Sequence, residues 1–178
     1  MQTEGEISRG KAIELLSERL AFARVSVGLY GTVLEKLGQR GGPYDIVRGH
    51  LRLIREEKMA HQDWLEEKVG GLGGDIGQAS GSSLLREEWA NIVAGLGEGT
   101  EPGPLFESLL TAEVYDNGGW EMLLELAERS ADEEMAAEIR QMLHEEQEHF
   151  LFVGRFVARF ARSSILDETP IVLEGNAA

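Results

Sequence analysis

The sequence has 178 residues, no cysteine and a formal net charge of -15, because 32 Asp and Glu residues outnumber 17 Lys and Arg residues. This length suits one domain, over residues 1–178, with a single core. The lack of cysteine excludes disulfides, thiolate metal sites and thiol nucleophiles. The acidic balance would repel phosphate backbones and anionic lipid surfaces, so neither nucleic acid nor a membrane is expected as a partner. The chain shows no secretory signal and no run of about 18 apolar residues, which predicts a cytoplasmic protein.

Apolar residues recur at three- and four-residue spacing along most of the chain, which predicts four long helices. The first two are expected over residues 7–37 and 44–69, joined into an antiparallel hairpin by the short stretch GQRGGPYD. The last two are expected over residues 104–128 and 132–162, with Ser130 and Glu133 at capping-box spacing. A Gly- and Ser-rich crossover with a short helix, LLREEWANIVAGL, links the hairpins. The pattern is that of an all-α four-helix bundle with one long connection, with a core over about residues 7–162 and an unassigned tail, 163–178.

Three polar residues fall on the apolar stripes of the third and fourth helices. A helical wheel places Glu113 in the middle of the stripe of the third helix. On the fourth helix Glu146 and His149 lie within the stripe, whereas His144 points away. Burying a carboxylate without a partner costs several kcal/mol, so Glu113 needs a cation, a hydrogen-bond donor or a proton.

The second helix places His61 on its apolar stripe and His50 close to the same line. A structural role is expected for His50, which lies two or more turns from the level of the other polar groups. Glu57 and Lys58 diverge from His61 to opposite sides, by about 40° and about 60°, so either side chain can enter the core. The first helix offers no inward acid, and Ala23 occupies the centre of its stripe.

These residues resemble the ferritin-like superfamily, in which two helices each give one Glu and two each give Glu-x-x-His to hold two iron or manganese ions. The stretches RLAFARVSVGLYGTVLEKL, IREEKMAHQDWLEEKVGGLGGD and LLTAEVYDNGGWEMLLELAERSADEEMAAEIRQMLHEEQEHF are similar to bacterial ferritin-like domain proteins. The resemblance implies that Glu113 is the single Glu of the third helix and that Glu146 with His149 is the Glu-x-x-His of the fourth. It also implies that His61 is the histidine of the second helix.

The sequence departs from the family pattern at two positions. Ala23 stands where the first helix should give its carboxylate, and Lys58 stands where the second helix should give its acid. At best Glu57, Glu113 and Glu146 remain as anionic ligands, which predicts a mononuclear or incomplete dinuclear site.

The first hypothesis is therefore a metal site whose candidate ligands combine imidazole and carboxylate groups. Iron or manganese suits this mixture, with zinc as an alternative. Oxygen or peroxide chemistry would follow if the ion were iron with an open position, although the sequence does not establish that the protein is an enzyme. The candidate ligands are Glu57, His61, Glu113, Glu146 and His149.

Two other hypotheses use the same residues differently. In the second, no metal binds, Lys58 neutralises the buried acids, and the protein is an interaction or dimerisation module. In the third, a small apolar ligand fills space beside Ala23 and Tyr30. A homodimer is the expected assembly, because long helical bundles often pair. Gly118 and Gly119, inside the third helix, indicate either close packing or a local distortion.

Overall fold

The computed structural model describes residues 9–78, 89, 91–97 and 99–166, and in this part of the chain it contains helices and no strands. The long helices are α1 (Arg9–Gly38), α2 (Asp45–Gly71), α4 (Pro102–Arg129) and α5 (Glu133–Leu166). The prediction of an all-α chain is therefore confirmed over these residues. Each helix lies within a few residues of its expected bounds, and α5 continues four residues beyond the expected end, into the tail that was left unassigned.

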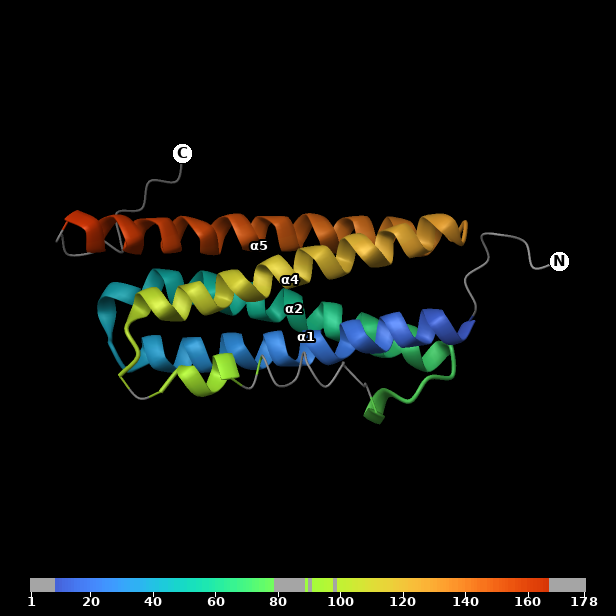
Figure 1. The fold of residues 1–178 in the computed structure, drawn as a ribbon, viewed down its shortest axis with the longest axis horizontal. Helices are drawn as coiled ribbons and strands as arrows, with labels where there is room; N and C mark the ends of the chain where they lie inside the picture. Colours follow the sequence, from blue (N-terminus) through green and yellow to red (C-terminus); the bar gives the residue numbers. More distant parts are fainter. Residues whose placement is uncertain (1–8, 79–88, 90, 98, 167–178) are drawn as a thin grey trace.

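The four long helices lie side by side as two hairpins (Figure 1). Helix α1 packs along α2, and α4 packs along α5, with a further contact between α1 and α4. The contact between α2 and α5 is the smallest of these. Among the described helices, none combines the length and the apolar character that crossing a membrane requires.

The described part of the crossover contains a 3-10 turn, η2 (Ile76–Gln78), and a helical stretch over residues 91–95. Its Trp89 is buried and meets the Phe22 ring of α1 edge to face, with 5.1 Å between ring centroids. Parts of three predicted segments lie outside the described residues, namely residues 7–8, residues 84–88 and 90 of the short helix, and residues 167–178 of the tail.

The turn between α4 and α5 differs from the capping box expected there. The hydroxyl of Ser130 donates backward, to the carbonyl of Leu126 at 2.9 Å, and so completes the end of α4. Asp132 caps α5 instead, because its Oδ1 accepts from the backbone N–H of Met135 at 3.0 Å. The expected role of Ser130 was wrong, because its hydroxyl has a nearer acceptor at the preceding helix end.

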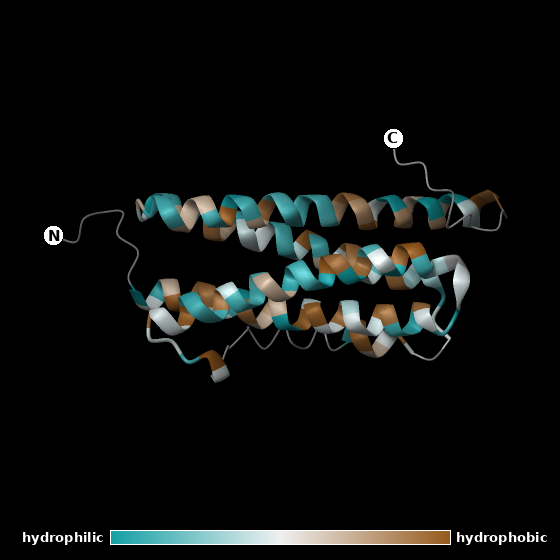
Figure 2. Cartoon of the chain, turned by 180° about the vertical axis from the view of Figure 1, so that it is seen from behind, coloured by the Kyte–Doolittle hydropathy of each residue, from teal (hydrophilic) through white to brown (hydrophobic). Residues whose placement is uncertain are grey.

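Two apolar clusters fill the space between the helices. One contains Leu16, Leu20, Trp120 and Ile139, and the other contains Leu29, Leu51, Phe106 and Val153. Viewed from behind, hydrophilic residues cover much of α5, with hydrophobic stretches between them (Figure 2). Buried polar residues interrupt the apolar interior between the two clusters.

His50 does not face the core as the wheel suggested. It is exposed, its Nδ1 lies 3.1 Å from the carbonyl of Ile46, and its ring stacks on Phe152 of α5. Ile46 is also 55% exposed. The first turns of α2 are thus more open than an apolar stripe indicates.

Candidate functional site

Lys58 is the central group of the buried polar cluster. It enters the core from α2 and its side chain is almost completely buried. Its Nζ lies 2.5 Å from Oε2 of Glu146, 2.8 Å from Oδ2 of Asp116 and 3.1 Å from Oε1 of Glu113. Helices α2, α4 and α5 therefore meet at one ammonium group, and the choice between Glu57 and Lys58 is resolved in favour of the lysine.

Glu113 is fully buried on α4 and has two donors. Tyr30 of α1 donates its hydroxyl to Oε1 at 2.6 Å, and Lys58 supplies the second hydrogen bond, to Oε2 at 3.3 Å. Burial raises the pKa of Glu113, and the charge of Lys58 partly opposes this rise. Burial likewise raises the pKa of Tyr30 well above its usual value, with Glu113 adding to the effect. The tyrosine hydroxyl therefore stays protonated and remains a donor.

Glu146 on α5 lies between two histidines. Its Oε1 lies 2.9 Å from Nδ1 of His61, and its Oε2 lies 3.4 Å from Nδ1 of His149. Burial alone would raise the pKa of Glu146, but Lys58 and the two imidazoles outweigh it and hold the pKa well below its usual range. Glu146 is therefore the firmly ionised acid of the cluster.

Each histidine also reaches an acid at the protein surface. Nε2 of His61 lies 2.7 Å from Oε2 of Glu145, and Nε2 of His149 lies 2.6 Å from Oε2 of Glu57. The Glu57 side chain is 50% exposed, so it lies at the rim of the cluster. Burial lowers the pKa of His149, but the neighbouring Glu146 carboxylate outweighs burial and the net pKa is raised. A positive His149 would help to balance the carboxylates around Lys58.

Two members of the cluster, Asp116 and Arg19, were missed by the sequence interpretation. The Nη2 of Arg19 on α1 contacts Oδ1 of Asp116, and both side chains are buried. Ser26 adds a hydrogen bond from Oγ to Oδ2 of Asp116 at 3.2 Å. Helical spacing contained the signal for both, because Asp116 is three residues after Glu113 and Arg19 is four residues before Ala23.

Gly119 of α4 is explained by the same ion pair. A Cβ at this position would collide with the guanidinium of Arg19, which crosses the helix there. A Cβ at Gly118 would meet nothing within 4 Å. Close packing, rather than a local distortion of the helix, therefore accounts for Gly119.

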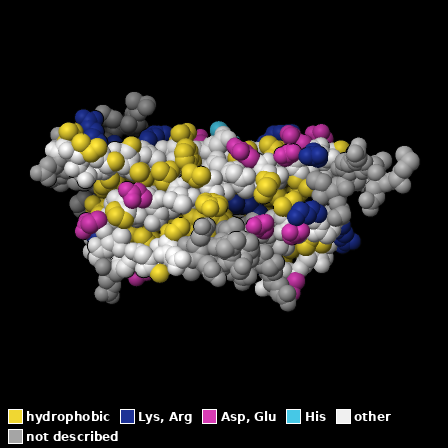
Figure 3. Space-filling model, in the orientation of Figure 1, with side chains coloured by type: hydrophobic (Ala, Val, Ile, Leu, Met, Phe, Trp, Pro, Cys, Tyr) yellow, Lys and Arg dark blue, Asp and Glu magenta, His cyan; other side chains and the backbone are white. Residues whose placement is uncertain are grey.

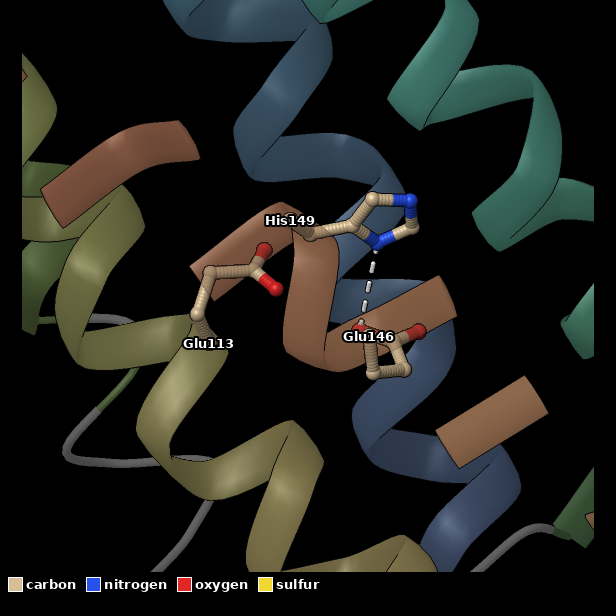
Figure 4. Close-up of side chains that lie close together, drawn as sticks. All are labelled: Glu113, Glu146 and His149. Carbon is tan, nitrogen blue, oxygen red and sulfur yellow. Dashed lines mark ion pairs between the residues drawn. The ribbon is translucent and has the colours of Figure 1, made fainter. Parts of the chain in front are cut away.

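Three of the predicted ligands lie close enough together to hold one ion. Glu113, Glu146 and His149 each offer a ligand atom, and these atoms lie within 4.8 Å of one another. Figure 4 shows Glu113 approaching from α4, with Glu146 and His149 together on α5. The other two candidate ligands, His61 and Glu57, lie outside this trio. His61 is hydrogen-bonded to Glu146, and Glu57 is hydrogen-bonded to His149.

The donors and acceptors around this trio do not fit a metal ion while Lys58 occupies the cluster. The Lys58 ammonium approaches oxygens of both Glu113 and Glu146, where an ion would need them as ligands. A cation so close to a divalent ion would repel it strongly in a buried site. The remaining oxygen of each acid also has a partner, Tyr30 on Glu113 and His61 on Glu146.

The space beside Ala23 is small. A cavity of about 10 Å³ lies there, bordered by Ser26, Lys58 and Trp120. A volume of this size holds about one water molecule. The small apolar ligand that was suggested beside Ala23 and Tyr30 does not fit it.

No protein-family model matches the chain, and a comparison with curated proteins finds no match either. The geometry of the cluster around Lys58 therefore carries the functional interpretation.

Proposed function

We propose that this protein is a ferritin-like four-helix bundle in which Lys58 takes the place of a metal ion, and that it works as a metal-independent binding module. The observation that carries the proposal is the approach of Lys58 Nζ to three buried carboxylates, at 2.5 to 3.1 Å. A protein of this kind would act through its outer surfaces, since its interior is occupied by ion pairs.

The chemistry of an ammonium group suits this substitution. Lysine has three N–H donors and no acceptor, and Lys58 has three carboxylate partners, on Glu113, Asp116 and Glu146. A divalent ion would join acids from different helices in the same way, but it would need several anionic ligands within its coordination shell. Here Ala23 removes one such ligand, and Lys58 supplies the positive charge.

Elemental analysis of the purified full-length protein tests this proposal. The protein should contain far less than one transition-metal ion per chain, even after expression in medium supplemented with iron and manganese. Its melting temperature should be unchanged by a chelator. A stoichiometric metal content, together with a lower melting temperature in the chelator, would refute the proposal.

Metal binding by Glu113, Glu146 and His149 is the second candidate function. Two observations favour it: the ligand atoms lie within 4.8 Å of one another, and the buried Nδ1 of His149 forms no hydrogen bond within the described residues. Iron or manganese suits these ligands, with zinc as an alternative. Loading with Fe(II) in air, followed by absorbance and oxygen uptake, tests this candidate, and no change in either signal would exclude iron-dependent oxygen chemistry.

A homodimer is also proposed, on the basis of apolar side chains at the surface of α2 and α5. Ile46 and Leu53 on α2 and Leu151 on α5 are each at least 55% exposed. Light scattering coupled to size-exclusion chromatography would test this assembly. A mass of one chain across the accessible concentration range would contradict it.

A further inference from the structure

An apolar groove runs between α1 and α4 on one face of the molecule. It has a volume of about 330 Å³ and is bordered by Leu15 and Phe22 of α1 and by Val114 and Met122 of α4. Hydrophobic side chains gather along the middle of this face of the molecule (Figure 3). Pockets that bind small molecules have volumes of roughly 300 to 1,000 Å³, so the groove is large enough for a small ligand.

Among the described residues that line the groove, Arg19 is the one cation. Its side chain is only 6% exposed, and burial lowers its pKa to about 10, so it remains charged at neutral pH. Its Nη1 makes a long hydrogen bond of 3.4 Å to the carbonyl of Tyr115, and its Nε has no hydrogen-bond partner within the described residues. Nη1 carries two N–H groups and uses one of them for Tyr115, so its second N–H remains as a donor beneath an apolar surface.

The wall of the groove is open at Gly118. Gly118 carries no side chain, and a Cβ there would meet nothing within 4 Å. At one end, the ring of Tyr115 stacks on Phe22 with 5.9 Å between centroids. Trp89 meets Tyr115 edge to face at 5.8 Å, so a fluorescent side chain lies next to the groove.

We propose that this groove binds a small amphipathic monocarboxylate, with its carboxylate at Nη1 of Arg19 and its apolar body along Phe22, Val114 and Met122. This inference rests on the proposed binding function and gives it a ligand class. Arginine has donors only, so the polar end of a ligand must be an acceptor, and a carboxylate forms the strongest hydrogen bonds of this kind. Glu18 at the rim and the net charge of -15 disfavour ligands with more than one acid group.

Asp116 and the proposed ligand use different nitrogens of the Arg19 guanidinium. Asp116 contacts Nη2 of Arg19, whereas the proposed carboxylate site is at Nη1. A ligand can therefore bind without breaking the ion pair that connects Arg19 to Lys58 through Asp116.

Titration of the full-length protein with decanoate, followed by calorimetry and by tryptophan fluorescence, tests the head group. Decanoate should bind saturably, with one site per chain and at least about tenfold more tightly than nonyltrimethylammonium, which has the same nonyl chain and the opposite charge. Equal or tighter binding of the cation would overturn the proposal, because it would indicate adsorption to an acidic, apolar surface.

Filling the groove tests its position. Gly118→Leu should weaken decanoate binding by at least about tenfold. Gly28→Leu is the matched control, because Gly28 is an exposed glycine inside α1 that does not line the groove and has nothing within 4 Å of its Cβ position. Unchanged binding in Gly118→Leu would overturn the proposal, as would equal losses in both variants. If Gly118→Leu fails to fold, the comparison of decanoate with the alkyltrimethylammonium ion on the parent protein still tests the proposal.

The two proposals fail in different ways. A protein that contains stoichiometric metal and still binds decanoate would refute only the metal-independent function. A metal-free protein that shows no saturable decanoate binding would refute only the proposal that the groove binds a monocarboxylate.

Discussion

Nζ of Lys58 lies 2.5 Å from Oε2 of Glu146, and both side chains are almost completely buried between α2 and α5. This ion pair is part of the small contact between these two helices. A buried charge that loses its partner costs about 3 to 5 kcal/mol. The packing of α2 against α5 therefore depends on the positive charge of Lys58.

Lys58→Met should therefore lower the free energy of unfolding by about 3 to 5 kcal/mol, because it leaves the buried Glu113 without its cation and removes one cation from Asp116 and Glu146. Lys68→Met is the matched control on the same helix, since Lys68 pairs with Glu138 in a partly exposed setting. The control should lose only about 0 to 1 kcal/mol. Urea denaturation measures both values, and a neutral Lys58→Met would contradict the role given to this lysine.

The hydroxyl of Tyr30 should contribute measurably to stability. Tyr30→Phe removes the 2.6 Å hydrogen bond to Glu113 and should cost about 1 to 3 kcal/mol. Tyr115→Phe changes a tyrosine that is 44% exposed and should stay within about 0.5 kcal/mol of the parent protein. Thermal denaturation of the two variants would show the difference, and equal stabilities would argue against the hydrogen bond.

The two adjacent glycines of α4 should respond in opposite directions to alanine. Gly118→Ala should stabilise the protein by about 0.5 to 1 kcal/mol, because alanine favours the helix and its Cβ meets nothing within 4 Å. Gly119→Ala should destabilise it by about 1 to 3 kcal/mol, since the Cβ displaces the guanidinium of Arg19. Stabilisation by both substitutions, measured by urea denaturation, would show that the Arg19 guanidinium does not need the space left by Gly119.

Stability should fall as the pH rises above about 6.5, and His149 should contribute to this fall. The pKa of His149 is raised above its usual value of 6.5, so its contribution is complete below that value and is lost as the pH rises through the folded pKa. The raised pKa of Glu113 acts in the same direction. The lowered pKa of Glu146 has the opposite sign, because its contribution is present above 4.5 and is lost as the pH falls.

Melting curves of His149→Gln across this range test the assignment. The variant should show a smaller fall with pH than the parent protein. His144→Gln is the control, because the His144 side chain is 72% exposed and lies outside the buried cluster. A fall of equal size in all three proteins would mean that His149 is not the group responsible.

Helical periodicity was sufficient to find much of the buried cluster. Glu113, Glu146, His61 and His149 are each surrounded by apolar residues at helical spacing, and all four are buried. The same period also identified the four long helices, because each buries a continuous apolar stripe.

The remaining features depended on contacts between helices, which a wheel of one helix does not contain. Glu57 and Lys58 lie on opposite sides of the apolar stripe of α2. Lys58 is the one that faces the core, because its ammonium group pairs with acids of α4 and α5 there. His50 lies on an apolar line, but it is exposed, and its ring stacks on Phe152 of α5. Arg19 and Asp116 lie at helical spacing from Ala23 and Glu113, but their ion pair is a contact between α1 and α4.

Replacing Lys58 by glutamate tests the central claim most directly, because it restores Glu-x-x-His on α2, with His61 as its histidine. Metal titration of both proteins, followed by melting temperature and elemental analysis, gives the comparison. The parent protein should not respond to Mn(II) or Co(II), whereas Lys58→Glu should be less stable without metal and should gain about 3 kcal/mol at a hundredfold excess over its dissociation constant. Stoichiometric binding by the parent protein, with no gain in Lys58→Glu, would contradict the account.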